Sequence, residues 1–85
     1  MSIEEITREL EKIKDQSRRH REGILQERAY LQESIQMTQQ YFGDQEAGRE
    51  MILYLEQVMQ KLGYAEAHVR DLYFKAEELT ARLQR

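Results

Sequence analysis

Two histidines and a run of basic residues are the side chains of this sequence with the clearest potential for chemistry. His20 lies within the stretch Arg18-Arg19-His20-Arg21-Glu22, and His68 follows Glu66 by two positions. A metal site needs further His, Cys or carboxylate ligands at matched spacing, and neither histidine has them. The chain also has no cysteine, which removes disulfide and thiolate chemistry. We therefore expect no metal and no cofactor.

Other catalytic constellations are equally sparse. A catalytic acid–base pair or nucleophile needs a pocket, and a long helical chain offers no obvious one. Gly43 and Gly48 are not spaced to cradle a phosphate. The basic stretch could contact a phosphate or an acidic partner, but a helix spreads these side chains around its axis. The net charge of −3 argues against nucleic-acid binding. We expect a non-catalytic protein with no small-molecule substrate.

Apolar residues recur at helical spacing along nearly the whole chain. From residue 48 to residue 83 they occupy two heptad positions without a break, which predicts one long helix with a coiled-coil seam. The first half repeats more weakly, with polar residues in the seam at Ser17, His20 and Glu27, and its register slips by four residues before Ile35. The seam predicted for the second half consists of Gly48, Met51, Leu55, Val58, Leu62, Ala65, Val69, Leu72, Ala76, Leu79 and Leu83.

Local signals mark where these helices begin and end. Ser2 and Glu5 form a capping box. In the central stretch Tyr41-Phe42-Gly43-Asp44, the glycine suits a left-handed residue after a helix and Asp44 suits the N-cap of the next. A turn this short makes the helices antiparallel. The sequence therefore predicts an all-α, coiled-coil-like helical hairpin forming a single domain over residues 1–85, with helices at 3–42 and 45–84, a turn at 43–44, and a length of roughly 60 Å.

Large apolar residues also lie outside the predicted seam. A continuous apolar stripe beside a seam is typical of helices that pack on more than one neighbour. We therefore expect the hairpin to complete a four-helix bundle, either with a protein partner or with a second copy as a homodimer. The predicted contact residues are Leu25, Tyr30, Met37, Ile52, Met59 and Tyr73.

The central turn gives the chain a family resemblance. An all-helical hairpin with an aromatic-x-Gly turn at its centre resembles the Trp-x-Gly superfamily, the Esx-like small proteins of type VII secretion. Tyr41-Phe42-Gly43 stands at the matching place, with Tyr41 where the family has Trp. With tyrosine in place of tryptophan, the chain resembles a divergent branch of the family, the small accessory partners of Leu-x-Gly toxins. The family also carries a Tyr-x-x-x-Asp/Glu secretion signal near the end of its second helix. Tyr73 and Glu77 are similar to it, and Phe74 with Glu78 is similar to a Phe-led variant.

The resemblance implies a function. The protein would act as an accessory or targeting chaperone that binds the helical domain of a larger secreted toxin, alone or with a second small hairpin. Tyr73 and Glu77 would be read by the secretion apparatus. Two alternatives share the same architecture: a homodimeric structural protein of phage or complex assembly, and a chaperone of another secretion system.

The sequence also bears on location. No apolar run approaches the roughly 18 residues that a membrane-spanning helix needs. The acidic start MSIEEITREL lacks the layout of a cleavable signal peptide. We expect a cytoplasmic protein; if it is co-secreted, it leaves the cell by a route that does not use such a signal.

Overall fold

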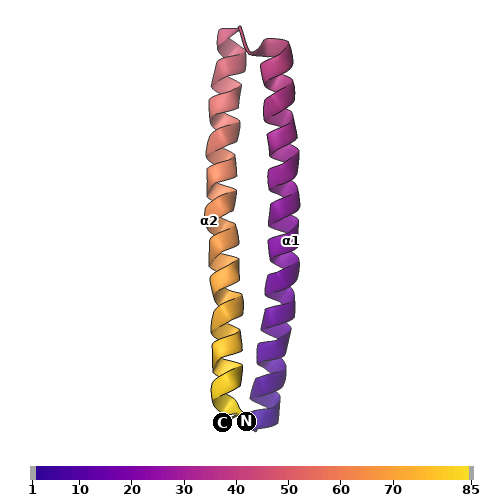
Figure 1. Cartoon of the computed structure of the whole chain (residues 1–85), viewed down its shortest axis with the longest axis vertical. Coiled ribbons are helices and arrows are strands. Elements are labelled where there is room, and N and C mark those ends of the chain that lie inside the picture. The colour runs from indigo at the N-terminus through magenta and orange to yellow at the C-terminus, as the bar shows by residue number, and fades with distance from the viewer. Residues whose placement is uncertain (1, 85) are drawn as a thin grey trace.

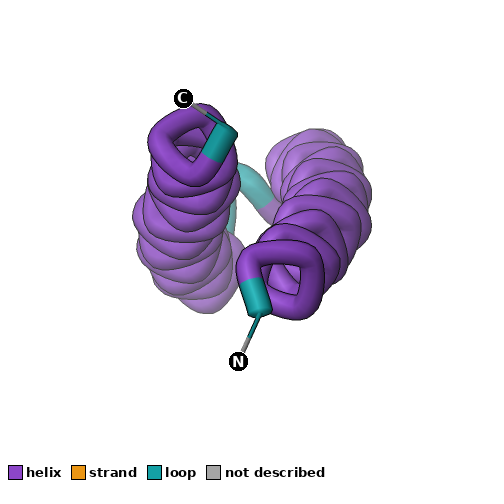
Figure 2. The backbone as a smooth tube through the Cα atoms, turned by 90° about the horizontal axis from the view of Figure 1, so that it is seen from below, coloured by secondary structure: helices purple, strands orange, loops and turns teal. Residues whose placement is uncertain are grey.

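Two proline-free segments of about forty residues fold into the two helices of this protein. The computed structural model describes residues 2–84, in which α1 spans Ile3–Phe42 and α2 spans Glu46–Leu83. The helices run antiparallel, so the start of α1 lies beside the end of α2, as Figure 1 shows. Seen along its length, the rod is a single pair of helices (Figure 2) measuring 61 × 17 × 14 Å. The predicted antiparallel helical hairpin is confirmed.

The first helix begins as its capping signal indicates. The Ser2 hydroxyl accepts a hydrogen bond from the backbone N–H of Glu5 at 3.1 Å. The second helix begins differently from the prediction, because its N-cap is Gln45 and not Asp44. The Gln45 side chain makes no capping hydrogen bond, and Asp44 instead offers its carbonyl oxygen to Arg49 at 3.3 Å. The predicted capping role of Asp44 is therefore wrong.

The turn needs glycine for lack of space and not for a left-handed backbone. Gly43 has φ −63° and ψ −22°, in the right-handed region, so the predicted left-handed conformation is wrong. The reversal is spread over residues 43–45, which removes the need for a single left-handed residue. A Cβ at Gly43 would collide with the carbonyl oxygen of Gln39, and one at Gly48 would collide with that of Phe42. Gly48 thus allows the first turn of α2 to lie directly against the end of α1.

The seam of α2 keeps one of its two predicted stripes, the one that begins at Gly48, and replaces the other. Ile52 is only 9% exposed and belongs to the core, whereas Met51 and Leu72 are about half exposed, at 51% and 50%. The interpretation of Ile52, Met59 and Tyr73 as residues outside the seam is therefore wrong. They alternate with one of the two predicted stripes and complete an unbroken heptad seam. The residues of this seam are Gly48, Ile52, Leu55, Met59, Leu62, Glu66, Val69, Tyr73, Ala76, Thr80 and Leu83.

The seam of α1 changes register in its middle. His20 and Glu27, which were predicted to face α2, are exposed, and Arg21 and Arg28 take their places. The four-residue slip thus falls at Ser17, which is 3% exposed, and not before Ile35. The residues of α1 that face α2 are Ile6, Leu10, Ile13, Ser17, Arg21, Ile24, Arg28, Leu31, Ile35 and Thr38.

Polar contacts between the helices favour the observed inward faces of both α1 and α2. Arg21 Nε donates a hydrogen bond to Glu66 Oε1 at 2.5 Å, and this pair links the middles of the two helices. The position of a Cβ at Gly63 lies 3.8 Å from Cζ of Arg28, so that guanidinium packs beside the glycine at ordinary contact distance. Buried charge is tolerated when it is paired, so the Arg21–Glu66 pair favours this register over one that faces His20 and Glu27 inward.

Candidate interaction surfaces

The predicted contact residues divide into two groups in the structure. Leu25, Tyr30 and Met37 on α1 are exposed and free to meet a partner. The three on α2 point into the hairpin, where Ile52 is buried and Met59 and Tyr73 are half-buried. The structure therefore does not join these six residues into one surface. Among the exposed apolar side chains of α2, Met51 and Leu72 belong to one of the two stripes that were predicted as seam.

That outward stripe, here called the apolar flank, runs along one side of the α2 seam. Its heptad positions combine apolar residues with basic or aromatic ones and contain no carboxylate. Along the helix it alternates by three and four residues, which keeps its side chains on one face. The members of the apolar flank on α2 are Met51, Tyr54, Val58, Lys61, Ala65, His68, Leu72, Lys75 and Leu79.

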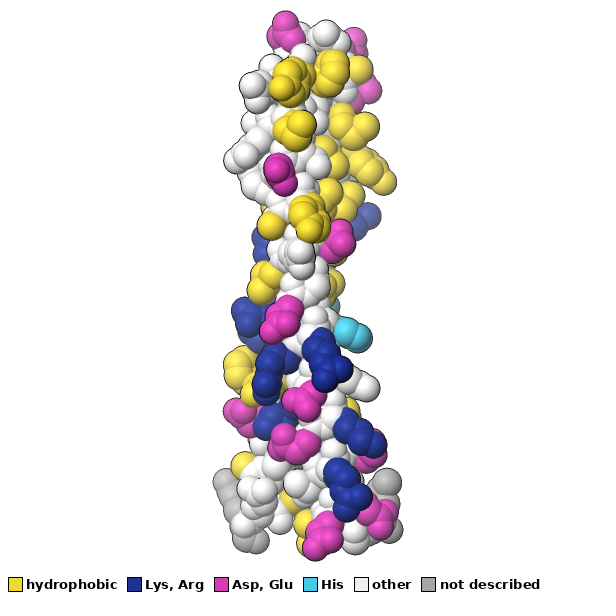
Figure 3. Space-filling model, turned by 90° about the vertical axis from the view of Figure 1, so that its right-hand side faces the viewer, with side chains coloured by type: hydrophobic (Ala, Val, Ile, Leu, Met, Phe, Trp, Pro, Cys, Tyr) yellow, Lys and Arg dark blue, Asp and Glu magenta, His cyan; other side chains and the backbone are white. Residues whose placement is uncertain are grey.

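The first helix extends the apolar flank near the turn. Thr38 of α1 and Met51 of α2 line the same shallow hollow, so they lie on the same side of the hairpin. Tyr41 follows Thr38 by three positions, and Tyr30 and Met37 share the face of Tyr41. Figure 3 shows that hydrophobic side chains gather in the half of the rod near the turn, whereas charged ones dominate the other half.

The middle of the hairpin is polar. The Arg21 guanidinium, by its hydrogen bond, lowers the pKa of the Glu66 carboxyl below its ordinary value. Desolvation opposes this shift, and the charges of Arg21, Arg70 and Arg28 add to it. The Oγ of Ser17 and the Nε of Arg28 are buried without a hydrogen-bond partner in residues 2–84. The Arg21–Glu66 pair is therefore the specific polar contact that this segment makes between the helices.

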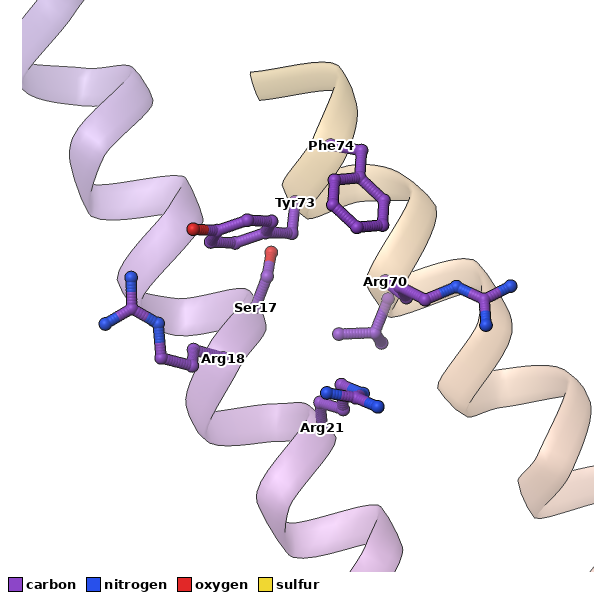
Figure 4. Close-up of a pocket in the computed structure, with 7 residues that line it drawn as sticks. Ser17, Arg18, Arg21, Arg70, Tyr73 and Phe74 are labelled. Carbon is purple, nitrogen blue, oxygen red and sulfur yellow. The ribbon is translucent and has the colours of Figure 1, made fainter. Parts of the chain in front are cut away.

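A pocket of about 370 Å³ opens next to this polar segment (Figure 4). Arg18 and Arg21 line it from α1, and Arg70 and Phe74 line it from α2. The Tyr73 ring lies between the helices, with Lys14 Nζ and Arg18 Cζ each 5.6 Å from its centroid. The sequence suggested no pocket, because the seam shift that creates this one depends on contacts between the helices.

The residues of the proposed secretion signal have different surroundings. Tyr73 is anchored by its two cation contacts and by an edge-on contact with Phe74, whose ring centroid is 5.7 Å away. Phe74 and Glu77 are exposed. Glu78 accepts a hydrogen bond from Arg82 at 2.8 Å and contacts Lys75 at 3.4 Å. Glu77 has no such neighbour among the ion pairs of residues 2–84.

The histidines show no metal chemistry in the described part of the chain. His20 and His68 are both exposed, and residues 2–84 contain no cluster of three or more His, Cys, Asp or Glu side chains that could hold a metal. Over the same residues, neither helix has a stretch apolar enough to cross a bilayer.

Comparison with known proteins adds no relative to this description. No family model matches the chain, and no curated protein or solved structure matches it either. The functional argument therefore rests on the surfaces of the hairpin itself.

Proposed function

We propose that this protein is a non-catalytic binding module that packs its apolar flank against the helices of a different protein and so completes a four-helix bundle. The observation that carries this proposal is an apolar flank left uncovered by the hairpin's own fold, with Met51 and Leu72 half exposed along its length. Helices with an apolar stripe on a second face are typical of bundles in which each helix has more than one neighbour.

The size of the exposed surface supports the same proposal. A compact protein of this mass exposes about 5,400 Å², whereas the hairpin exposes 6718 Å². The difference is of the same order as the roughly 800 Å² that each partner contributes to an ordinary protein interface. Docking on one side of the rod would bring the exposed surface close to that of a compact domain.

The charges of the apolar flank favour a different chain over a second copy. Lys61 and Lys75 lie equally far from His68, so two antiparallel copies that paired through this flank with the two-fold axis at His68 would place lysine opposite lysine. Like charges brought together at an interface oppose association. The partner should instead present an apolar stripe bordered by Asp or Glu. Burial of that stripe would provide the driving force, at about 25 cal/mol per Å² of apolar surface.

The resemblance to Esx-like hairpins suggests what this partner is. On this proposal it is the helical domain of a larger secreted toxin, bound directly or together with a second small hairpin, and the protein serves as its accessory or targeting chaperone in type VII secretion. The central turn at Tyr41-Phe42-Gly43 and the exposed Glu77 near the end of α2 support the assignment. In this reading the protein is made in the cytoplasm and leaves the cell with its cargo.

Binding is tested by co-expression with the larger helical protein encoded next to it, followed by size-exclusion chromatography with light scattering. Met37→Glu combined with Tyr54→Glu should abolish the complex while circular dichroism still reports a helical chain, because both side chains are exposed. Tyr64→Glu is the control, since Tyr64 is equally exposed but lies on the outer face of α2. A complex that survives the double substitution contradicts the proposed binding face.

Export is a separate test of the same proposal. Glu77→Ala should block secretion of the complex without weakening it, if Tyr73 and Glu77 act as the signal. Glu78→Ala tests the Phe-led variant of that signal. Secretion that is unchanged by both substitutions would remove the secretion signal and leave the binding function standing.

A further inference from the structure

The side of α2 opposite the apolar flank carries a charge pattern that is complementary to itself. Because the α2 seam is an unbroken heptad from residue 48 to residue 83, residues seven apart share one stripe along the helix. On this side the stripe reads Arg49, Glu56, Gly63, Arg70 and Glu77. We call it the charge stripe.

Reversing the charge stripe about Gly63 places opposite charges against each other. Glu56 and Arg70 each lie 7 positions from Gly63, and Arg49 and Glu77 each lie 14 positions from it. Two antiparallel copies of α2 would therefore form the pairs Arg49–Glu77 and Glu56–Arg70, each twice. Two parallel copies would instead face arginine with arginine and glutamate with glutamate, which opposes that arrangement.

The neighbouring positions fit the same geometry. Leu53 lies 10 residues before Gly63 and Phe74 lies 11 after it, and both side chains are exposed. In the antiparallel arrangement, Leu53 of one copy meets Phe74 of the other. At the centre, Gly63 has no side chain and Ala67 has a small one, so the two helices can approach closely where they cross.

The charges on this stripe are largely free within one chain. Glu56 and Glu77 take part in none of the ion pairs found in residues 2–84. The nearest carboxylate to Arg70 among those pairs is Asp71, at 3.9 Å. Arg28 lies against Gly63 from the α1 side, and its Nε lacks an acceptor.

We infer that a second copy of this chain binds the charge stripe, forming an antiparallel homodimer whose two-fold axis passes beside Gly63. An interface of this kind uses the same patch on both copies, so every favourable pair occurs twice. The dimer leaves the apolar flank open, because the charge stripe lies on the other side of the seam. An experiment that disproves the homodimer would therefore leave the proposed partner binding untouched, and the reverse also holds.

Sedimentation velocity over a range of protein concentrations tests the dimer. Glu56→Arg alone and Arg70→Glu alone should each raise the dimer dissociation constant by roughly tenfold or more, because each puts two like-charge pairs into the interface. The double variant should return to within about threefold of the original. Glu50→Arg makes the same change in charge on the outer face of α2 and should leave the constant unchanged. A chain that stays monomeric up to about 200 µM, or a double variant that is not rescued, overturns the inference.

A covalent test does not depend on ion-pair strength. The chain has no cysteine, so a single introduced one reports only on contact between copies. Gly63→Cys should form an intermolecular disulfide in air at low micromolar concentration, because residues on a two-fold axis can meet the Cα separation of about 4.4–6.8 Å that a disulfide needs. Tyr64→Cys, one position away on the outer face, should remain reduced. Equal crosslinking of both variants would contradict the two-fold arrangement.

Discussion

The half of the hairpin near the turn and the half near the chain ends are held together by different means. Near the turn, over residues 29–62, the buried residues are Ile35, Gly48 and Ile52. In the other half they are Ser17, Glu66, Ala76 and Thr80, all small or polar. The turn half has seven charged residues, whereas the described part of the other half has 21.

This difference separates two requirements that one continuous hairpin must meet. Apolar packing in the turn half stabilises the fold without strict geometry, because apolar burial is non-directional. Polar contacts in the other half contribute less net free energy, but they require one register, since an unmatched buried polar group is costly. We therefore expect the turn half to supply most of the stability and the polar half to select which stripe of each helix faces inward.

The largest expected effect comes from removing apolar packing in the turn half. Ile52→Ala should lower the free energy of unfolding by about 2–4 kcal/mol, because it leaves a cavity in the core. Gln57→Ala, at an exposed position on the outer face of α2, should change it by about 0.5 kcal/mol or less. Urea unfolding followed by circular dichroism, at one protein concentration, measures both. Thr80→Ala should also have a small effect, since the Thr80 hydroxyl bonds to Ala76 of its own helix. Equal losses of unfolding free energy in Ile52→Ala and Thr80→Ala would contradict the proposed difference between the two halves.

Two glycines give the next largest contrast. Gly48→Ala should destabilise the protein by about 1–3 kcal/mol, because the new methyl group meets the backbone of Phe42. Gly23→Ala should stabilise it by about 0.5–1 kcal/mol, since no atom lies within 4 Å of that position and alanine is the better helix former. Thermal unfolding of the two variants side by side is the measurement. A stabilising Gly48→Ala would show that the turn can move aside.

A smaller effect of opposite sign is expected at Ser17. Its hydroxyl is buried without a partner, so Ser17→Ala removes an unsatisfied polar group and should stabilise the hairpin by about 1 kcal/mol. Ser17→Val is the companion variant. It should destabilise the hairpin, because a larger side chain has no room at a position that is 3% exposed. A loss of stability in Ser17→Ala would mean that the Ser17 hydroxyl is hydrogen-bonded to water in the folded protein.

The sequence was sufficient to predict the hairpin but not its inner faces. Heptad spacing, the Ser2 cap and the central Gly43 are local signals, and they predicted two antiparallel helices. The inward stripe of α2 was ambiguous, because two adjacent stripes are both apolar enough to form a seam. The choice between them depends on Arg21 meeting Glu66, which are 45 residues apart in the sequence.

The candidate surfaces were likewise predictable where they depend on one helix alone and not where they depend on contacts between the helices. Leu25, Tyr30 and Met37 were predicted as exposed contact residues from α1 alone, and the structure leaves them exposed. Ile52 was misplaced because its exposure is decided by the register between the helices. Reading Arg21 and Glu66 as a candidate pair would have favoured the correct register, since both lie near the middle of their helices and carry opposite charges.

The smallest expected effect is the pH dependence that the Arg21–Glu66 pair adds to the polar half. The pKa of Glu66 is lower in the folded chain than in the unfolded one, so the unfolded chain takes up a proton first as the pH falls. The stabilisation is therefore complete at neutral pH and is lost as the pH drops through the folded pKa. The midpoint difference between the original chain and Glu66→Gln should stay constant from pH 7 to about 5 and shrink below that. Glu27→Gln, at an exposed position that makes no ion pair with a described residue, should give a flat difference over the same range. If Glu66→Gln is also flat, the pair contributes no stability through charge, and the register must be selected by packing at Ser17 and Gly63.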